Sequence, residues 1–81
     1  SSFRRDIKKI ASQRKKMADL DVVIETLASQ KRLDARYKDH ALTGDLRGYR
    51  ECHIKPDWLL IYYVVDGTLY LARTGSHSDL F

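Results

Sequence analysis

The continuous apolar segment from Trp58 to Val65 constrains the fold of this chain more than any other feature. Aromatic and β-branched residues dominate it, and a short run of that composition favours a strand. Pro56 stands just before the segment, and Asp66-Gly67, a strong signal for a two-residue hairpin turn, follows it. Because the segment is apolar on both faces, we expect it to be the central strand of a small sheet.

Two neighbouring strands are expected, residues 49–55 before this segment and residues 68–74 after the turn. In the earlier one, Cys52 and Ile54 share one face, whereas Glu51, His53 and Lys55 share the opposite face. One side of this strand is therefore apolar and the other is polar. We expect any chemistry to take place on the polar side.

The N-terminal part of the chain has helical periodicity instead. Apolar residues recur at three- and four-residue spacing from Phe3 to Met17, with Ser2 as the expected N-cap, and Asp19 is expected to cap a second helix. Residues 33–48 lose this periodicity, gather Asp and Gly, and are expected to form a long loop. The pattern predicts an α+β fold, in which an N-terminal helical hairpin packs on one face of a small, mainly antiparallel β-sheet.

Length and composition limit the class of protein. With 81 residues, 43% hydrophobic and 32% charged, the chain is expected to be one folded domain, residues 1–81. Its single cysteine, Cys52, cannot form an internal disulfide, which fits a reducing, cytoplasmic location. The longest apolar run is far shorter than the ~20 residues that span a bilayer, so no membrane association is expected.

Positive charge is concentrated at the start of the chain. Residues 1–16 contain seven Lys and Arg against one Asp, a local charge of +6, although the net charge is only +4. A basic patch of this kind is what electrostatic binding of nucleic acid requires, and Lys8, Lys9 and Lys15 are the expected substrate-binding cations within it. A solvated helix face with no binding role explains the same residues, so this feature alone leaves both interpretations open.

The candidate reactive side chains lie mainly in the second half of the chain. No paired cysteines, H-E-x-x-H motif or glycine-rich phosphate loop occurs, so neither a metal nor a cofactor is expected. What remains suits metal-free RNA cleavage, in which a base deprotonates the 2′-hydroxyl, an acid protonates the leaving 5′-oxygen and a cation stabilises the phosphorane. The candidates are His40, His53, Asp57, Arg73, His77 and Phe81.

An ordered series of short motifs resembles the YafQ branch of the RelE toxin superfamily. The series covers roughly residues 37–81, and residues 3–9 look like the first helix of that family. Its members are Tyr37-Lys38-Asp39-His40, Leu42-Thr43-Gly44, Gly48-Tyr49-Arg50, His53-Ile54, Pro56-Asp57-Trp58-Leu59-Leu60-Ile61-Tyr62, Arg73-Thr74-Gly75-Ser76-His77 and Leu80-Phe81. The family fold begins with a short strand before the first helix, and this sequence starts at the helix.

The resemblance implies a ribosome-dependent mRNA interferase, the toxin of a type II toxin–antitoxin system. Such a protein cuts messenger RNA in the ribosomal A site and is silenced by a cognate antitoxin in a hetero-oligomer. By motif position His77 resembles the general acid and Arg73 the phosphate-stabilising cation, while either Asp57 or His53 fits the base. His40 also falls in the implied active site, and Trp58 and Phe81 at implied substrate contacts.

Other interpretations remain for the function and for single residues. Trp58 opens an apolar strand and fits the core as well as the site, and His40 could only hydrogen-bond the loop. A noncatalytic member of the superfamily, acting as a partner-binding or co-repressor module, would keep the fold and lose cleavage. A gyrase-directed toxin similar to the ParE branch would share the fold without needing this set of histidines.

Overall fold

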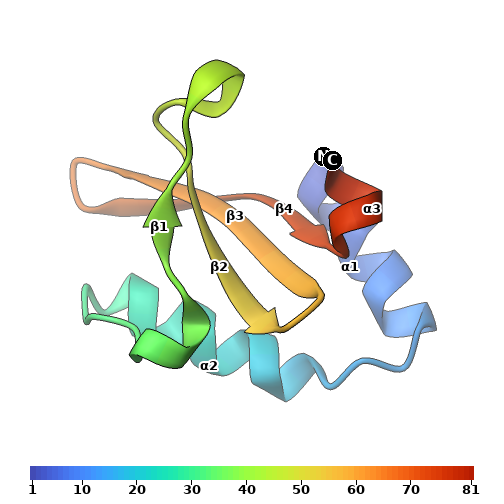
Figure 1. Ribbon diagram of the computed structural model, residues 1–81. Helices are drawn as coiled ribbons and strands as arrows, with labels where there is room; N and C mark the ends of the chain where they lie inside the picture. Colours follow the sequence, from blue (N-terminus) through green and yellow to red (C-terminus); the bar gives the residue numbers. More distant parts are fainter.

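A four-stranded antiparallel sheet, in the order β1-β2-β3-β4, forms the centre of the computed structural model, which describes residues 1–81 (Figure 1). The central and edge strands are β1 (His40–Ala41), β2 (Arg50–Lys55), β3 (Trp58–Val65) and β4 (Thr68–Gly75). The apolar segment that begins at Trp58 is thus an interior strand between β2 and β4, as expected. Asp66 and Gly67 both have positive φ, 51° and 76°, which is the backbone that a tight two-residue hairpin needs.

Three helices accompany the sheet: α1 (Ser2–Ser12), α2 (Met17–Ala28) and the single turn α3 (His77–Leu80). Helix α1 packs mainly against β4, while α2 lies across β2 and β4, on the same face. Helix α3 lies beside α1, to which Asp79 is joined through Lys9. No helix combines the length and the apolar composition that a membrane crossing would require. The predicted α+β fold with two helices on one sheet face is confirmed.

The helix boundaries differ from the expected ones. Ser1, not Ser2, is the N-cap of α1, because its Oγ accepts a hydrogen bond from the backbone N–H of Arg4. Helix α1 ends at Ser12, and Arg14 adopts a left-handed φ of 59° in the connection, so Met17 belongs to α2. Asp19 lies in the first turn of α2 and does not cap it, since the N-cap residue is Lys16.

The core lies between the helices and one face of the sheet. Ile10 of α1 and Leu20 and Val23 of α2 pack against apolar side chains of β2 and β3. Each fully buried Leu or Ile stabilises the fold by roughly 1.5–3 kcal/mol. The strand residues in this cluster are Cys52, Ile54, Trp58, Leu60 and Tyr62. The opposite face of β3 is also buried, at Leu59 and Ile61, beneath the polar residues described below.

The segment expected to be a long loop has structure of its own. It contains two 3-10 turns, η1 (Ala35–Tyr37) and η2 (Gly44–Leu46), and the short edge strand β1 between them. Asp39 anchors it to the sheet by accepting hydrogen bonds from the Tyr62 hydroxyl at 2.5 Å and from Arg50 at 3.3 Å. These tertiary contacts place His40 of β1 opposite Glu51 of β2.

Candidate active site

Three histidines that are far apart in the sequence meet beside the end of β2. His53 lies in the middle, with its ring centroid 6.4 Å from that of His40 and 5.7 Å from that of His77. His40 comes from β1, which pairs with β2, and His77 is the first residue of α3, directly after β4. The antiparallel order of the strands therefore produces the cluster that the sequence only suggested.

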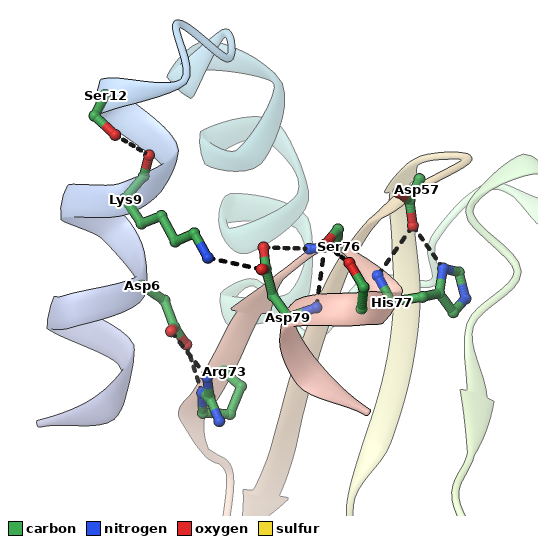
Figure 2. Close-up of polar contacts among 9 residues, drawn as sticks. Asp6, Lys9, Ser12, Asp57, Arg73, Ser76, His77 and Asp79 are labelled. Atoms are coloured by element: carbon green, nitrogen blue, oxygen red, sulfur yellow. Dashed lines mark hydrogen bonds and ion pairs between the residues drawn. The ribbon is translucent and has the colours of Figure 1, made fainter.

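Asp57 holds the His77 imidazole in a fixed orientation. One of its oxygens, Oδ1, lies 2.8 Å from His77 Nδ1 and accepts a hydrogen bond from the His77 backbone N–H at 3.0 Å (Figure 2). The backbone hydrogen bond, followed by the ring contact, lowers the pKa of Asp57 below its ordinary value. Asp57 is therefore an acceptor at neutral pH, so Nδ1 carries the proton shared with it and Nε2 is left for another partner.

The single turn α3 that carries His77 is anchored at both sides. Ser76 and Asp79 form a capping box, in which the Ser76 side chain accepts from the Asp79 N–H and the Asp79 side chain accepts from the Ser76 N–H. Lys9 of α1 donates to Asp79 Oδ1 at 2.7 Å (Figure 2). Lys9 was expected to bind substrate, but here its charge is paired within the protein and fastens α3 to α1.

Glu51 is a member of the site that we did not nominate from the sequence. Glu51 is 6% exposed. Its Oε1 atom lies 3.4 Å from His53 Nε2 and 3.9 Å from His40 Nε2. A buried carboxylate is costly unless it is paired, and the two imidazoles are its partners. The alternation that put Glu51 and His53 on the same polar face of the strand was the available signal.

The same residues form a set that could bind a metal. One ligand atom each from Glu51, His53 and His77 lies within 4.8 Å of the others. Two imidazole nitrogens and a carboxylate oxygen are donors that suit zinc or copper. We expected no ligand set because no close spacing occurs in the sequence, and that reasoning was incomplete, since the donors come from β2 and α3 and meet only in the folded chain.

Arg73 is held by a second residue that we had not nominated, Asp6 of α1. Arg73 donates from Nε to Asp6 Oδ2 at 2.7 Å and from Nη2 to Oδ1 at 3.1 Å, and the buried Thr74 N–H donates to the same carboxylate at 3.1 Å. The hydrogen bonds to Asp6 raise the pKa of Arg73, so it stays fully charged. Asp6 falls on the apolar stripe of α1, between Phe3 and Ile10, which was the signal for its burial.

The expected substrate-binding residues have different environments. Trp58, nominated as a contact for substrate, is instead 2% exposed, and its indole N–H donates to Thr74 Oγ1 at 3.0 Å inside the core. This position corrects the nomination, because a ring enclosed by the core cannot stack on a base. Phe81 is 62% exposed and does not fill the core. Lys8 is exposed on α1, and Lys15 is half-buried with its ammonium 5.8 Å from the Trp58 ring centroid.

Comparison with known proteins assigns this fold to a class. A family described as the bacterial toxin YafQ of a type II toxin–antitoxin system matches residues 1–81. The crystal structure of a copper-bound mutant toxin from Helicobacter pylori matches the whole chain and 92% of its own, at 46% identity and a TM-score of 0.95. The fold is therefore that of a type II toxin.

The particular family follows from two Escherichia coli relatives. The mRNA interferase toxin YafQ of strain K12 is 40% identical over 80 residues, which are 98% of this chain and 87% of that protein. The crystal structure of the E. coli DinJ-YafQ complex matches all of this chain and 91% of that chain, at 39% identity and a TM-score of 0.92. This chain belongs to the YafQ toxin family.

Proposed function

We propose that this toxin is a ribosome-dependent, metal-independent endoribonuclease that cleaves messenger RNA in the A site. The observation that carries the proposal is the pair formed by His53 and His77, with ring centroids 5.7 Å apart and His77 oriented by Asp57. Two imidazoles on adjacent elements can remove one proton and supply another near neutral pH. The E. coli relative, 40% identical, is named an mRNA interferase.

The reaction assigns one role to each histidine. His53 takes the proton of the 2′-hydroxyl as the 2′-oxygen bonds to the adjacent phosphorus. The bond from phosphorus to the 5′-oxygen then breaks, and His77, as the imidazolium protonated on both ring nitrogens, donates its Nε2 proton to that oxygen. The products are a 2′,3′-cyclic phosphate and a free 5′-hydroxyl, with no external reactant.

His53 suits the role of base better than Asp57 does. Asp57 is already an acceptor for both the ring and the backbone of His77, and these hydrogen bonds lower its pKa. A lowered pKa weakens a carboxylate as a base. Asp57 is therefore proposed as the residue that positions the acid, in place of a direct role in proton abstraction.

The remaining site residues contact the substrate in this proposal. Arg73 uses only Nε and Nη2 for Asp6, so Nη1 is available for a phosphate oxygen in the transition state. His40 lies on the side of His53 away from His77, and it orients the attacking nucleotide. Phe81, exposed on the residue after α3, stacks on a base beside the scissile phosphate.

The proposed partners follow from the same relatives. We propose that a cognate antitoxin binds this toxin in a hetero-oligomer, as DinJ does in the E. coli DinJ-YafQ complex, and that the toxin acts on cytoplasmic ribosomes. The basic first helix is a suitable surface for an acidic antitoxin segment. The ribosome supplies the orientation of the messenger that a small domain cannot provide alone.

We propose that metal binding inhibits RNA cleavage. A Helicobacter pylori toxin of matching fold is described as copper-bound, and Glu51, His53 and His77 give this chain a set of donors that could hold such an ion. A metal held there would occupy the imidazole nitrogens that the two proton transfers require. Selective chelation of transition metals should therefore leave cleavage unchanged, whereas added copper or zinc should decrease it; loss of cleavage on chelation, restored by zinc, would refute metal independence.

In vitro translation followed by primer extension of the messenger tests the whole proposal. The wild-type toxin should generate discrete cuts with ribosomes and few on the same RNA alone, and His77→Gln should abolish them. Uncut messenger together with tight antitoxin binding would indicate a noncatalytic partner-binding module. Uncut messenger together with inhibited DNA supercoiling would indicate a gyrase-directed toxin.

A further inference from the structure

A cavity that adjoins the histidine cluster is not used by the mechanism above. It is a groove of about 550 Å³ between α2, the η1 turn and the end of β2. His53 forms part of its wall, together with Tyr37 and Pro56. A volume of this size falls within the range of sites that enclose small organic groups.

A second groove of about 400 Å³ continues from the first. Asp19 and Lys55 line both cavities, so they mark the junction, and Asp57 and Trp58 line the second. The two grooves together pass both His53 and Asp57. A chain lying in them would therefore continue directly into the proposed active site.

The walls of this combined groove are strongly basic. Its lining contains five cations and only two carboxylates, those of Asp19 and Asp57. The cations come from three separate segments: Lys15 and Lys16 from the connection after α1, Arg36 and Lys38 around η1, and Lys55 from the end of β2. Only the fold brings these charges together, because the basic segment seen in the sequence, residues 1–16, contains only Lys15 and Lys16 of them.

Several of these cations are free to bind a ligand. Lys55 Nζ lies 3.6 Å from Asp19 Oδ2, which accepts no hydrogen bond, so the pair is loose and the ammonium can turn to a phosphate. Lys16 and Lys38 are exposed side chains. The Lys55 side chain is 60% exposed, so its ammonium can contact a phosphate while it stays beside Asp19.

One wall of the groove offers a flat surface for a base. The Arg36 guanidinium carbon lies 4.9 Å from the Tyr37 ring centroid, and Arg36 also donates to the Tyr37 hydroxyl at 3.0 Å. Unstacked RNA bases are bound on aromatic rings and on arginine planes of this kind. A cationic track with an aromatic platform is the combination that single-stranded nucleic acid requires.

We propose that this groove binds the RNA strand on one side of the scissile phosphate, with Lys38, Lys55 and Lys16 on successive phosphates and the Tyr37–Arg36 pair under a base. This inference rests on the proposed ribonuclease function and adds the substrate subsite that leads into it. An acidic antitoxin segment fits the groove less well. It has no bases for the Tyr37 platform.

Direct binding measurements test the groove separately from cleavage. The catalytically silenced His77→Gln toxin is titrated against a short fluorescent single-stranded RNA, and fluorescence anisotropy is measured at several salt concentrations. Lys38→Ala with Lys55→Ala should weaken binding about tenfold or more, because two charge-assisted contacts to phosphates are lost. The slope of log K against log salt should fall by about 1.4, at ~0.7 for each phosphate contact on a single strand.

Matched variants separate the groove from general charge and from folding. Lys31→Ala removes an exposed lysine outside the groove and should leave binding unchanged. Tyr37→Leu should weaken binding about five- to 150-fold, the fold-change of one stacked base, and Tyr37→Phe should retain it because the ring remains. Equal melting temperatures of Tyr37→Phe and the lysine variants show that their folds are intact.

The possible results decide the two proposals independently. Unchanged RNA affinity in the double lysine variant overturns the proposal that the groove binds RNA, even if the wild type cleaves messenger. Absence of RNA binding by the His77→Gln toxin at low salt overturns it as well. Loss of affinity for an acidic Glu-rich peptide, without loss of affinity for RNA, also overturns it and assigns the groove to a protein partner. If RNA binding depends on the groove but the wild type cuts no messenger, the RNA-binding role of the groove stands and the proposed ribonuclease activity is refuted.

Discussion

Replacement of Asp6 tests whether a buried carboxylate on α1 both stabilises the fold and positions the proposed phosphate-binding cation. Asp6 is 9% exposed and accepts hydrogen bonds from Arg73 and from the buried Thr74 N–H. Asp6→Ala leaves that N–H without a partner, which costs about 1–3 kcal/mol. The Arg73 side chain is 40% exposed, so loss of the ion pair itself adds at most ~1 kcal/mol.

These contributions predict measurable changes in stability and in activity. For a domain of this size, a loss of 1 kcal/mol lowers the melting temperature by about 4–8 °C. Asp6→Ala should therefore melt at least ~4 °C below wild type, and Asp6→Asn should lose less, because the amide oxygen still accepts one of the hydrogen bonds. At a temperature where both variants are folded, cleavage by Asp6→Ala should fall by about tenfold or more as Arg73 loses its fixed orientation.

Thermal unfolding by circular dichroism and ribosome-dependent cleavage of one messenger give the two readouts. Asp21→Asn, an exposed acidic residue of α2, is the matched control and should change neither. An unchanged melting temperature for Asp6→Ala would refute the energetic argument for the buried N–H. A lower melting temperature with unimpaired cleavage would refute the positioning of Arg73.

Two further predictions concern the C-terminal part of the site. Phe81→Ala should leave the melting temperature unchanged, because Phe81 is 62% exposed. The same substitution should reduce cleavage about five- to 150-fold if the ring stacks on a base. A large drop in melting temperature with normal cleavage would contradict the stacking role. Asp57→Asn should reduce cleavage at neutral pH with little change in stability. The folded pKa of Asp57 is lowered from 3.8, so its contact with His77 is fully present above that value and is lost only as the pH falls through the lower folded pKa. The carboxyl carbon of Asp57, followed by NMR, should therefore show no titration from pH 5 upward, and a titration of that carboxyl near pH 6 to 7 would contradict its ionised state.

The sequence by itself determined the sheet and the general nature of the site. The apolar run from Trp58 and the Asp66-Gly67 turn define β3 and its hairpin with β4 through local chemistry alone, so both were predictable. The ordered motifs around His40, His53, Asp57 and His77 indicated the toxin family, which the match to residues 1–81 confirms. Strand alternation also placed Glu51 and His53 on the polar face.

Only the tertiary structure decided which partner each side chain has. Whether Trp58 faces the core or the substrate depends on the position of Thr74, sixteen residues away in sequence, whose hydroxyl accepts from the indole N–H. Likewise Lys9 was expected to bind substrate, but its nearest anion, Asp79, comes from the opposite end of the chain. Periodicity describes local backbone geometry and contains no information on such long-range pairs.

The cavities and the donor set have the same physical origin. Glu51, His53 and His77 approach within 4.8 Å because β2 and α3 are joined through the antiparallel β3 and β4. The basic groove likewise combines Lys15, Arg36 and Lys55 from segments that the helices and the η1 turn fold against one another. The sequence therefore determined which chemical groups are present and on which local face they lie, whereas strand order and helix packing decided which of them meet.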